Sequence, residues 1–255
     1  MCRRQAGRRN ADVVKPQIEA MINFFRRIRK KLANDNKPLK YMRYAIGEIV
    51  LVVIGILIAL QVNNWNEDYK ESLAIKNVLI EIKEDLIQDK AELERNIELR
   101  TEDFEAQKRI IKVLETNMGF NENVRSDLGR IHLARNVFSS SKGYDLLKEL
   151  NLGALRDKEL RILLTRYYER DIALVHREYA DDKLEFESFW LPYVRMHFKE
   201  WVFGDYALPH DYSHILNDQT LLTATKMNSN NLNNTISAYN TALNTAIKLI
   251  NQLPE

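Results

Sequence analysis

The sequence predicts an all-α protein with one N-terminal transmembrane helix, followed by a coiled-coil-like bundle of long helices. Two observations predict this class. Residues 45–62 form an apolar run of eighteen residues that contains a single ionisable group. The chain also has only eight glycines and five prolines in 255 residues, and its long segments mix Leu, Ile, Glu, Lys and Arg at helical rather than alternating spacing.

The apolar run, AIGEIVLVVIGILIALQV, is long enough to cross a bilayer when its flanks are included. Eighteen residues rise by about 27 Å in an α-helix, against a hydrocarbon core of about 30 Å. Tyr44 and Trp65 bracket the run with rings that favour the headgroup region, so we assign the span to residues 45–65. A soluble core helix and a cleaved signal peptide are the alternatives. Against them, no face between Ile49 and Leu60 is polar, and no small-x-small cleavage site follows.

The distribution of charge around the run predicts its orientation. The twenty residues before it hold eight Lys and Arg, and the twenty after it hold two. The basic segment 21–44 should therefore stay in the cytoplasm, and residues 66–255 should form the domain outside it, in the periplasm of a double-membrane bacterium. Anionic lipid of the inner leaflet would attract the basic flank, which comprises Arg26, Arg27, Arg29, Lys30, Lys31, Lys40 and Arg43.

Two features inside the run are candidates for function. Glu48 is its lone ionisable residue and lies five residues, or about 7.5 Å, beyond Arg43. We expect it to pair near the interface with Arg43 or Lys40 rather than to carry protons or ions. Gly55 and Ala59 form a small-xxx-small pair through which a second copy could approach, although such pairs also arise by chance.

Charge and cysteine content exclude several classes for the domain outside the membrane. Residues 1–44 hold 13 of the 38 basic and 3 of the 36 acidic residues, which leaves 25 basic and 33 acidic residues for the rest. A net negative domain lacks the clustered cations that nucleic acid requires. Cys2 is the only cysteine, so no disulfide can form within one chain and packing alone must stabilise the domain.

The first twenty residues stand apart from the rest. Residues 1–20 show no hydrophobic period, and Met21 opens the coherent basic segment. We expect residues 1–20 to be a non-native or disordered extension, with Met21 as the natural start.

The domain should begin with one long amphipathic helix over residues 68–117. This stretch has no Gly or Pro, and its apolar positions include seven-residue steps at Leu79, Leu86 and Leu93. Arg100 and Gln107 interrupt the apolar seam, which favours a helix packed in a bundle over a free-standing dimeric coiled coil.

Shorter elements should follow. The pattern predicts helices over 124–138 and 144–150, separated by a run of three serines. Gly153 suits the left-handed position after a helix end. Asp157 suits the N-cap of the next helix.

The remaining elements complete the bundle. A long aromatic-rich helix should run from residue 158 through Trp190 and bend at Pro192. After a loop at 204–209, Asn217 should cap a helix that ends near Met227, and a last helix should cover 232–250.

Few residues indicate chemistry. His210 and His214, four apart, are weak candidates for metal ligands, because the segment reads as a loop and no HExxH is present. No GxSxG, P-loop or GxGxxG motif occurs, so we assign no catalytic residue and no cofactor. The aromatic side chains of the later helices should be bundle core: Tyr167, Tyr168, Tyr179, Phe186, Phe189, Trp190 and Trp201.

The anchor resembles that of a known family. FFRRIRKKL followed by YAIGEI and VIGILIALQVNNWNE closely resembles an uncharacterised family of bacterial single-span membrane proteins. A weaker likeness continues in Gly143-Tyr144-x-x-Leu147 and in Gly153-x-Leu155, ending at Tyr167-Tyr168. The resemblance implies the single-span topology from about Met21 onward and transfers no catalytic residue.

Two functional hypotheses follow. The first is a non-enzymatic, membrane-anchored helical protein that scaffolds or senses, with the bilayer and either a second copy or another protein as partners. The second is an extracytoplasmic enzyme or metal- or ligand-binding domain that uses the aromatic helix and the His210/His214 loop.

Overall fold

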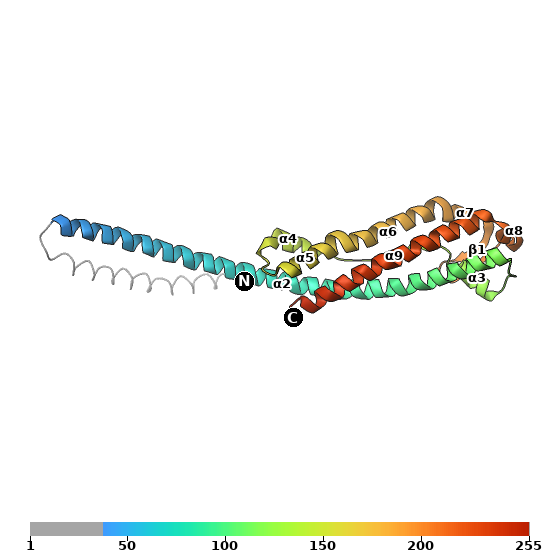
Figure 1. The fold of residues 1–255 in the computed structure, drawn as a ribbon, viewed down its shortest axis with the longest axis horizontal. Coiled ribbons are helices and arrows are strands. Elements are labelled where there is room, and N and C mark those ends of the chain that lie inside the picture. The colour runs from blue at the N-terminus through green and yellow to red at the C-terminus, as the bar shows by residue number, and fades with distance from the viewer. Residues whose placement is uncertain (1–37, 255) are drawn as a thin grey trace, which may run out of the picture. The chain divides into compact units, whose positions relative to one another are not determined.

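The computed structural model describes residues 38–254, which divide between Tyr69 and Lys70 into two compact units. Within them the protein is mostly helical, and the second unit is a bundle of long helices, as the sequence predicts (Figure 1). The segment 1–20 and much of the basic segment lie outside the described residues, including Arg26, Arg27, Arg29, Lys30 and Lys31.

Helix α2, Pro38–Thr116, is the longest element and runs through both units without a break. The sequence predicts a span over 45–65 and a separate helix over 68–117. They are one helix because neither glycine nor proline occurs between residues 56 and 116. The helix stops where Asn117 adopts a left-handed backbone with φ of 51°, at the residue where the sequence predicts its end.

A second row of helical segments packs in the bundle. It comprises α5 (Lys158–Arg166), η2 (Tyr167–Asp171), α6 (Ile172–Glu185), η3 (Phe186–Trp190) and α7 (Leu191–His197). This row is the predicted aromatic-rich helix, but η2 and η3 are π-helical. Asp157 caps it as predicted, accepting hydrogen bonds from the backbone amides of Glu159 and Leu160. Pro192 lies in the first turn of α7, directly after the π-helical segment η3.

The C-terminal part differs from the prediction. Residue Asn217 ends the short helix α8, Tyr212–Asn217, and Asp218 is the residue that caps the following helix. That helix, α9, spans Gln219–Gln252 without a break, so the two predicted helices are one. The asparagine-rich stretch after Met227 lowers intrinsic helix propensity, but the buried side chain of Asn228 is hydrogen-bonded to His132 and to the carbonyl oxygen of Ile131 there.

The predicted helix over 124–138 is wrong beyond its first turns. Helix α3 covers only Glu122–Leu128, and the chain after Gly129 crosses the bundle without regular structure. Gly129 packs directly against backbone: a Cβ there would lie 2.5 Å from the amide nitrogen of Tyr206. Its carbonyl oxygen also accepts a hydrogen bond from the backbone of Gly204.

Helix α4, Lys142–Glu149, agrees with the prediction for 144–150, but the turn after it does not. Asn151, with φ of 84°, takes the left-handed position expected for Gly153. Gly153 instead lies in the short 3₁₀ helix η1, Leu152–Ala154. The side-chain oxygen of Asn151 accepts a hydrogen bond from the Gly153 amide, a local bond that makes asparagine suitable there.

A β-hairpin replaces the predicted loop at 204–209. Strands β1 (Phe198–Val202) and β2 (Tyr206–Pro209) pair antiparallel, with an irregularity between Phe198 and Glu200. Gly204 supplies the turn with φ of 75°. Strands of four and five residues are too short to show a clear alternation, which is why the sequence pattern misses them.

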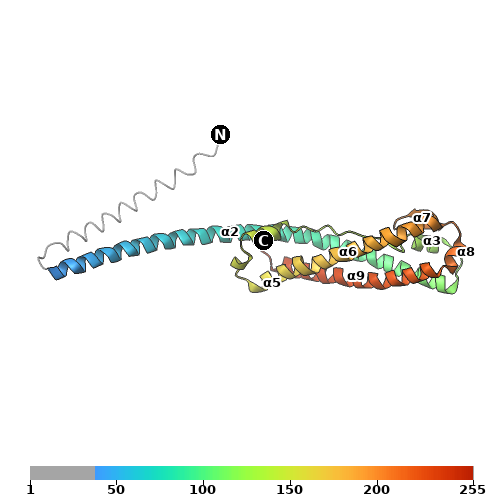
Figure 2. The same cartoon turned by 90° about the horizontal axis from the view of Figure 1, so that it is seen from above.

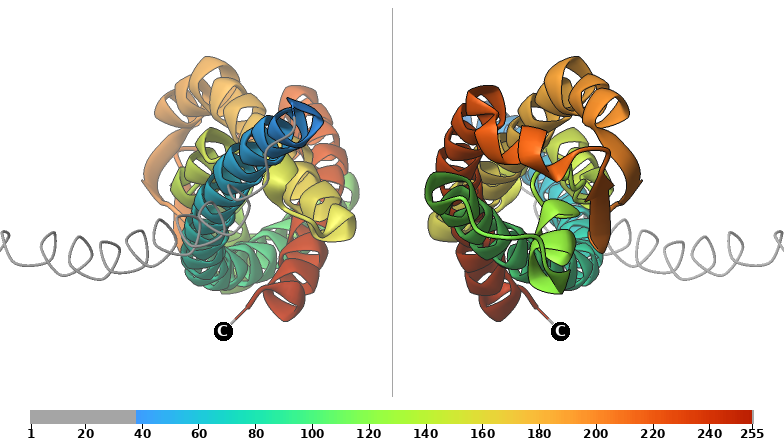
Figure 3. Two further views of the ribbon diagram at one scale, coloured as in Figure 1. Left: turned by 90° about the vertical axis from the view of Figure 1, so that its left-hand side faces the viewer. Right: turned by 90° about the vertical axis from the view of Figure 1, so that its right-hand side faces the viewer.

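Two separate hydrophobic clusters stabilise the second unit. In Figures 1 and 2 α2, the α5–α7 row and α9 run side by side, and Figure 1 shows α4 and α5 at one end of the bundle and α3, α8 and the hairpin at the other. The end-on views of Figure 3 show these helices grouped around a common axis. The first cluster, near α4, includes Ile82, Leu86, Leu93, Tyr144, Leu147, Leu164, Tyr167, Val175, Tyr239 and Leu249. The second, near the hairpin, includes Ile110, Leu128, Ile131, Trp190, Phe198, Ala207, Ile215 and Leu221.

The close approach at Gly129 predicts a large effect of a small substitution. Gly129→Ala should lower the free energy of unfolding by about 1–3 kcal/mol, since neither the new methyl group nor the Tyr206 backbone can move aside. Gly119→Ala is the matched control, because a Cβ at Gly119 would meet nothing within 4 Å. Urea unfolding followed by circular dichroism measures both, and equal stability of the two variants would contradict the packing described here.

Candidate functional site

The apolar segment of α2 exposes side chains on all of its faces. Twelve large hydrophobic residues between Met42 and Val62 are 45–63% exposed, and the helix is long and apolar enough to cross a membrane. Such exposure argues against a soluble core helix, which would be buried. This segment is therefore a candidate membrane anchor.

The predicted anchor residues lie on this helix. Tyr44 is partly exposed, whereas Glu48 and Ala59 are exposed and Trp65 is 73% exposed. A side chain at Gly55 would meet nothing within 4 Å, so the helix offers an open surface there. The pairing of Glu48 with Arg43 or Lys40 stays a prediction, and the side chain of Lys40 lies outside the described part of the chain.

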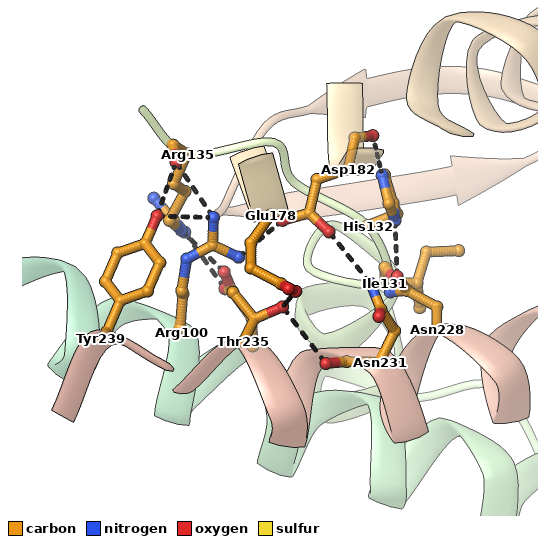
Figure 4. A network of polar contacts seen from close by, with 11 residues as sticks. Arg100, Ile131, His132, Arg135, Glu178, Asp182, Asn228, Asn231, Thr235 and Tyr239 are labelled. Atoms are coloured by element: carbon orange, nitrogen blue, oxygen red, sulfur yellow. Dashed lines mark hydrogen bonds and ion pairs between the residues drawn. The ribbon is translucent and has the colours of Figure 1, made fainter. Parts of the chain in front are cut away.

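Buried polar side chains separate the two hydrophobic clusters in the second unit, and we call this set the polar layer. On α2 they follow Ile97 and precede Ile110, and on α6 and α9 they likewise lie between residues of the two clusters. Its fully or nearly fully buried members are Arg100, Asp103, Gln107, His132, Asp182, Thr225, Asn228 and Thr235. A close view shows most of them converging from α2, α6, α9 and the irregular segment after Gly129 (Figure 4).

Arg100 is the centre of the polar layer. Its Nη1 lies 2.8 Å from Oδ2 of Asp182, and the two side chains are 1% and 4% exposed. Its Nη2 donates to the carbonyl oxygen of Arg135 and to the hydroxyl of Tyr239. Burial lowers the pKa of Arg100, but the nearby Tyr239 and Asp182 outweigh that effect and raise it. The guanidinium therefore stays charged and ties three elements together.

His132 extends this network from the irregular segment. Its Nδ1 lies 2.9 Å from Oδ1 of Asn228 and its Nε2 lies 3.0 Å from the carbonyl oxygen of Asp182. Both ring nitrogens thus have partners, while the ring stacks on Phe186 and Trp190. The side-chain amide of Asn228 in turn donates to the carbonyl oxygen of Ile131. This geometry holds the irregular segment against α6 and α9.

Asp103 fixes the same segment from α2. Its carboxylate accepts hydrogen bonds from Arg135 at 2.7 Å and 3.1 Å and from Arg130 at 3.1 Å. The two arginines are only partly exposed, and the aspartate is buried. The chain after α3 therefore follows a path set by charged pairs rather than by a helix.

A further buried carboxyl lies beside the first cluster. Tyr167 donates a hydrogen bond of 2.8 Å to Oδ2 of Asp89. Burial raises the pKa of Asp89 to about 6, against the opposing effect of the Tyr167 hydrogen bond. Because the pKa is raised in the folded protein, this carboxyl favours folding most when the pH is below its ordinary pKa, and that contribution is lost as the pH rises through about 6. Burial also raises the pKa of Tyr167.

The group of potential ligands that the structure assembles includes His214 but not His210. His214 lies instead beside His197, with ring centroids 4.8 Å apart, and near Asp218. His210 follows strand β2, is exposed, and does not belong to this group. The sequence pattern misses His197 because it lies on the far side of the hairpin, seventeen residues before His214.

One other histidine, His176, and an open groove are weaker candidates for a functional site. His176 Nε2 lies 2.9 Å from the hydroxyl of Ser139 in an exposed position. A groove between α2 and α9 is lined by Phe104, Lys108, Lys226 and Asn230, among others. Its lysines already pair with acidic residues of the chain. Neither place assembles the acid, base and nucleophile that a hydrolytic site would need.

The aromatic residues agree with the predicted role in the core. Tyr167, Tyr168 and Trp190 are buried, whereas Tyr179, Phe186, Phe189 and Trp201 are half-buried around them. The Tyr168 hydroxyl is buried without a hydrogen-bond partner, and its ring stacks on Tyr144 at 4.6 Å.

These features define a class of protein: a long-helix bundle preceded, on the same helix, by an exposed apolar segment. The chain belongs to DUF6090, a family of unknown function, whose model matches residues 48–188. The match begins inside the apolar segment and ends within η3, so it includes most of α2 and α6. No curated protein and no solved structure shows significant similarity to the chain.

The buried ion pair predicts a non-additive response to mutation. Arg100→Met or Asp182→Leu should each lower the free energy of unfolding by about 3–5 kcal/mol, because each leaves a buried charge without its partner. The double variant should lose less than the sum of the two. Arg95→Met is the control: this side chain is 70% exposed on the same helix and should matter by less than about 0.5 kcal/mol. Additive losses in denaturant unfolding would contradict direct coupling.

Proposed function

We propose that this protein is anchored by a single membrane span and holds its helical bundle outside the cytoplasm, where it binds other proteins as a scaffold or sensor. The observation that carries the proposal is the exposed apolar segment of α2, which continues directly into a bundle with its own buried core. A lipid phase is the environment that suits such a segment. The family match, which includes most of this segment, is consistent with this view.

The orientation rests on charge. Eight Lys and Arg precede the apolar run and two follow it within twenty residues on each side. This asymmetry favours a cytoplasmic N-terminus and an extracytoplasmic bundle. In a bacterium with two membranes, the host membrane would be the inner one and the bundle would lie in the periplasm.

The bundle itself supports a binding role rather than chemistry. Most of its buried polar groups pair with one another, as in the Arg100–Asp182 and Asp103–Arg135 pairs. Groups committed in this way fix the arrangement of helices and are not available to a substrate. Several hydrophobic side chains of the bundle are nevertheless exposed, among them Met196 at 71% and Phe203 at 58%. These exposed positions are where contact with a protein partner can be probed.

A reporter fusion tests the location. Alkaline phosphatase joined after Glu255 should be active and should sediment with membranes. Val53→Arg combined with Leu57→Arg should abolish both, because each arginine at the centre of a span costs about 2.5–3.5 kcal/mol of insertion free energy. Ile87→Arg is the matched control, since Ile87 lies on the same helix, is 50% exposed and belongs to the bundle. An inactive native fusion, or a native chain that stays in the supernatant, would contradict the proposal.

Site-specific photo-crosslinking tests the binding role in native membranes. A photoreactive residue at Met196 or Phe203 should give adducts of reproducible mass with a partner. The same residue at Arg95 or Lys76, which are also exposed, should not. An adduct of twice the chain mass would identify a second copy as the partner. The binding role would be rejected if no position gave a defined adduct.

A further inference from the structure

Three potential metal ligands converge near the hairpin end of the bundle. His197 is the last residue of α7, His214 lies in α8, and Asp218 joins α8 to α9. One ligand atom from each residue lies within 4.8 Å of the other two. The three residues come from α7, from α8 beyond the hairpin, and from the junction of α8 with α9, so the fold rather than a local sequence motif brings them together.

Asp218 is held in place by its surroundings. Its Oδ1 accepts hydrogen bonds from the backbone amides of Thr220 and Leu221 at 2.8 Å and 3.2 Å. Its Oδ2 accepts one from the hydroxyl of Tyr193 at 2.5 Å and lies 4.0 Å from Nε2 of His214. A carboxylate oriented by a neighbouring hydroxyl is a common arrangement around bound metal ions.

His197 is positioned by contacts on two sides. Its ring lies 4.4 Å from the ring of Tyr193, and its carbonyl oxygen accepts a hydrogen bond from the backbone of His210 at 2.9 Å. The His214 side chain is 53% exposed, stacks on His197 and has its Nε2 4.0 Å from the Asp218 carboxylate. His197 and Asp218 are thus each held by several contacts, and His214 is the most exposed of the three ligands.

We propose that His197, His214 and Asp218 bind a divalent transition-metal ion of the zinc class. Two imidazoles and one carboxylate are a donor set that Zn²⁺ and Co²⁺ accept, in a tetrahedral site whose fourth position is open to water. Ligand atoms around tetrahedral zinc lie about 3.3 Å apart, so binding draws the exposed His214 inward. The site would join α7, α8 and the start of α9, and it does not depend on the membrane location proposed above.

The competing explanation is an ion pair between protonated His214 and Asp218, with His197 only packed beside them. It needs no metal, and it predicts that neither histidine affects metal binding. The two explanations therefore differ in one measurable quantity, the affinity of the intact protein for Zn²⁺.

The test uses the full chain in detergent, purified without a histidine tag and stripped with chelator. Calorimetric titration with Zn²⁺ should show one saturable site per chain, and Co²⁺ should give the intense visible absorption of a tetrahedral complex. His214→Ala and His197→Ala should each abolish the site. Tyr193→Phe should weaken it by about 10–100-fold, the usual effect of losing a group that orients a ligand.

Two further variants make the result specific. His210→Ala is the matched control, because His210 is exposed and close in sequence to His214 but lies outside the group, and it should bind zinc as the native chain does. Asp218→Asn retains an N-capping side chain but removes the charge, so it should fold normally, as judged by circular dichroism, and lose zinc. The proposal is overturned if the native chain shows no saturable zinc binding, if binding survives in His197→Ala and His214→Ala, or if His210→Ala loses it.

Discussion

The ion pair between Arg100 and Asp182 is the interaction on which the arrangement of the bundle depends. It is almost completely buried, and it connects α2 to α6 while the same guanidinium binds α9 through Tyr239 and the irregular segment through the backbone of Arg135. Hydrophobic contacts alone tolerate sliding of one helix along another, because leucine and isoleucine fit many neighbours. A buried charge has few acceptable partners and therefore does not tolerate such sliding. The polar layer therefore sets the register in which the two hydrophobic clusters form.

Helix α2 has two parts with different surfaces: an apolar segment exposed on every face and an amphipathic segment packed in the bundle. Its first part exposes apolar side chains on every face, whereas from Ile75 onward the buried residues form one stripe that faces the bundle. The change takes place over the polar stretch after Val62, which contains asparagine and acidic residues. The apolar segment and the bundle thus use different residues of one helix, so a mutation in one part leaves the contacts of the other unchanged.

The sequence predicts the long elements well because they are long. Helical spacing over residues 68–117 and the Asp157 cap need no knowledge of the rest of the chain, and both are present. Predictions that depend on distant contacts are wrong: the helix over 124–138 ends early because Gly129 meets Tyr206, and the break before the last helix is absent because Asn228 is satisfied inside the polar layer.

The candidate sites also differ in whether the local sequence pattern reveals them or only the fold brings their residues together. The apolar segment is visible in the sequence as composition, whereas the group of His197, His214 and Asp218 is not, because a hairpin separates its first member from the others. Spacing by four made His210 the apparent partner of His214. His210 lies beside His197 through a backbone hydrogen bond, but its ring is not one of the three grouped ligands.

The two π-helical segments have a geometric consequence for the α5–α7 row. Buried and half-buried residues recur at steps of four in both halves of the row: Leu160, Leu164, Tyr168 and Ile172, then Asp182, Phe186, Trp190 and Val194. In a straight α-helix each step of four turns the side chain by about 40° beyond a full rotation, so such a series would wind away from its neighbours. The wider turns at η2 and η3 cancel part of this drift. The two π-helical segments thereby keep the buried face of the α5–α7 row directed toward its neighbouring helices along the whole row. They are also the positions at which one residue could be inserted or removed without turning the far end of the row away from the core.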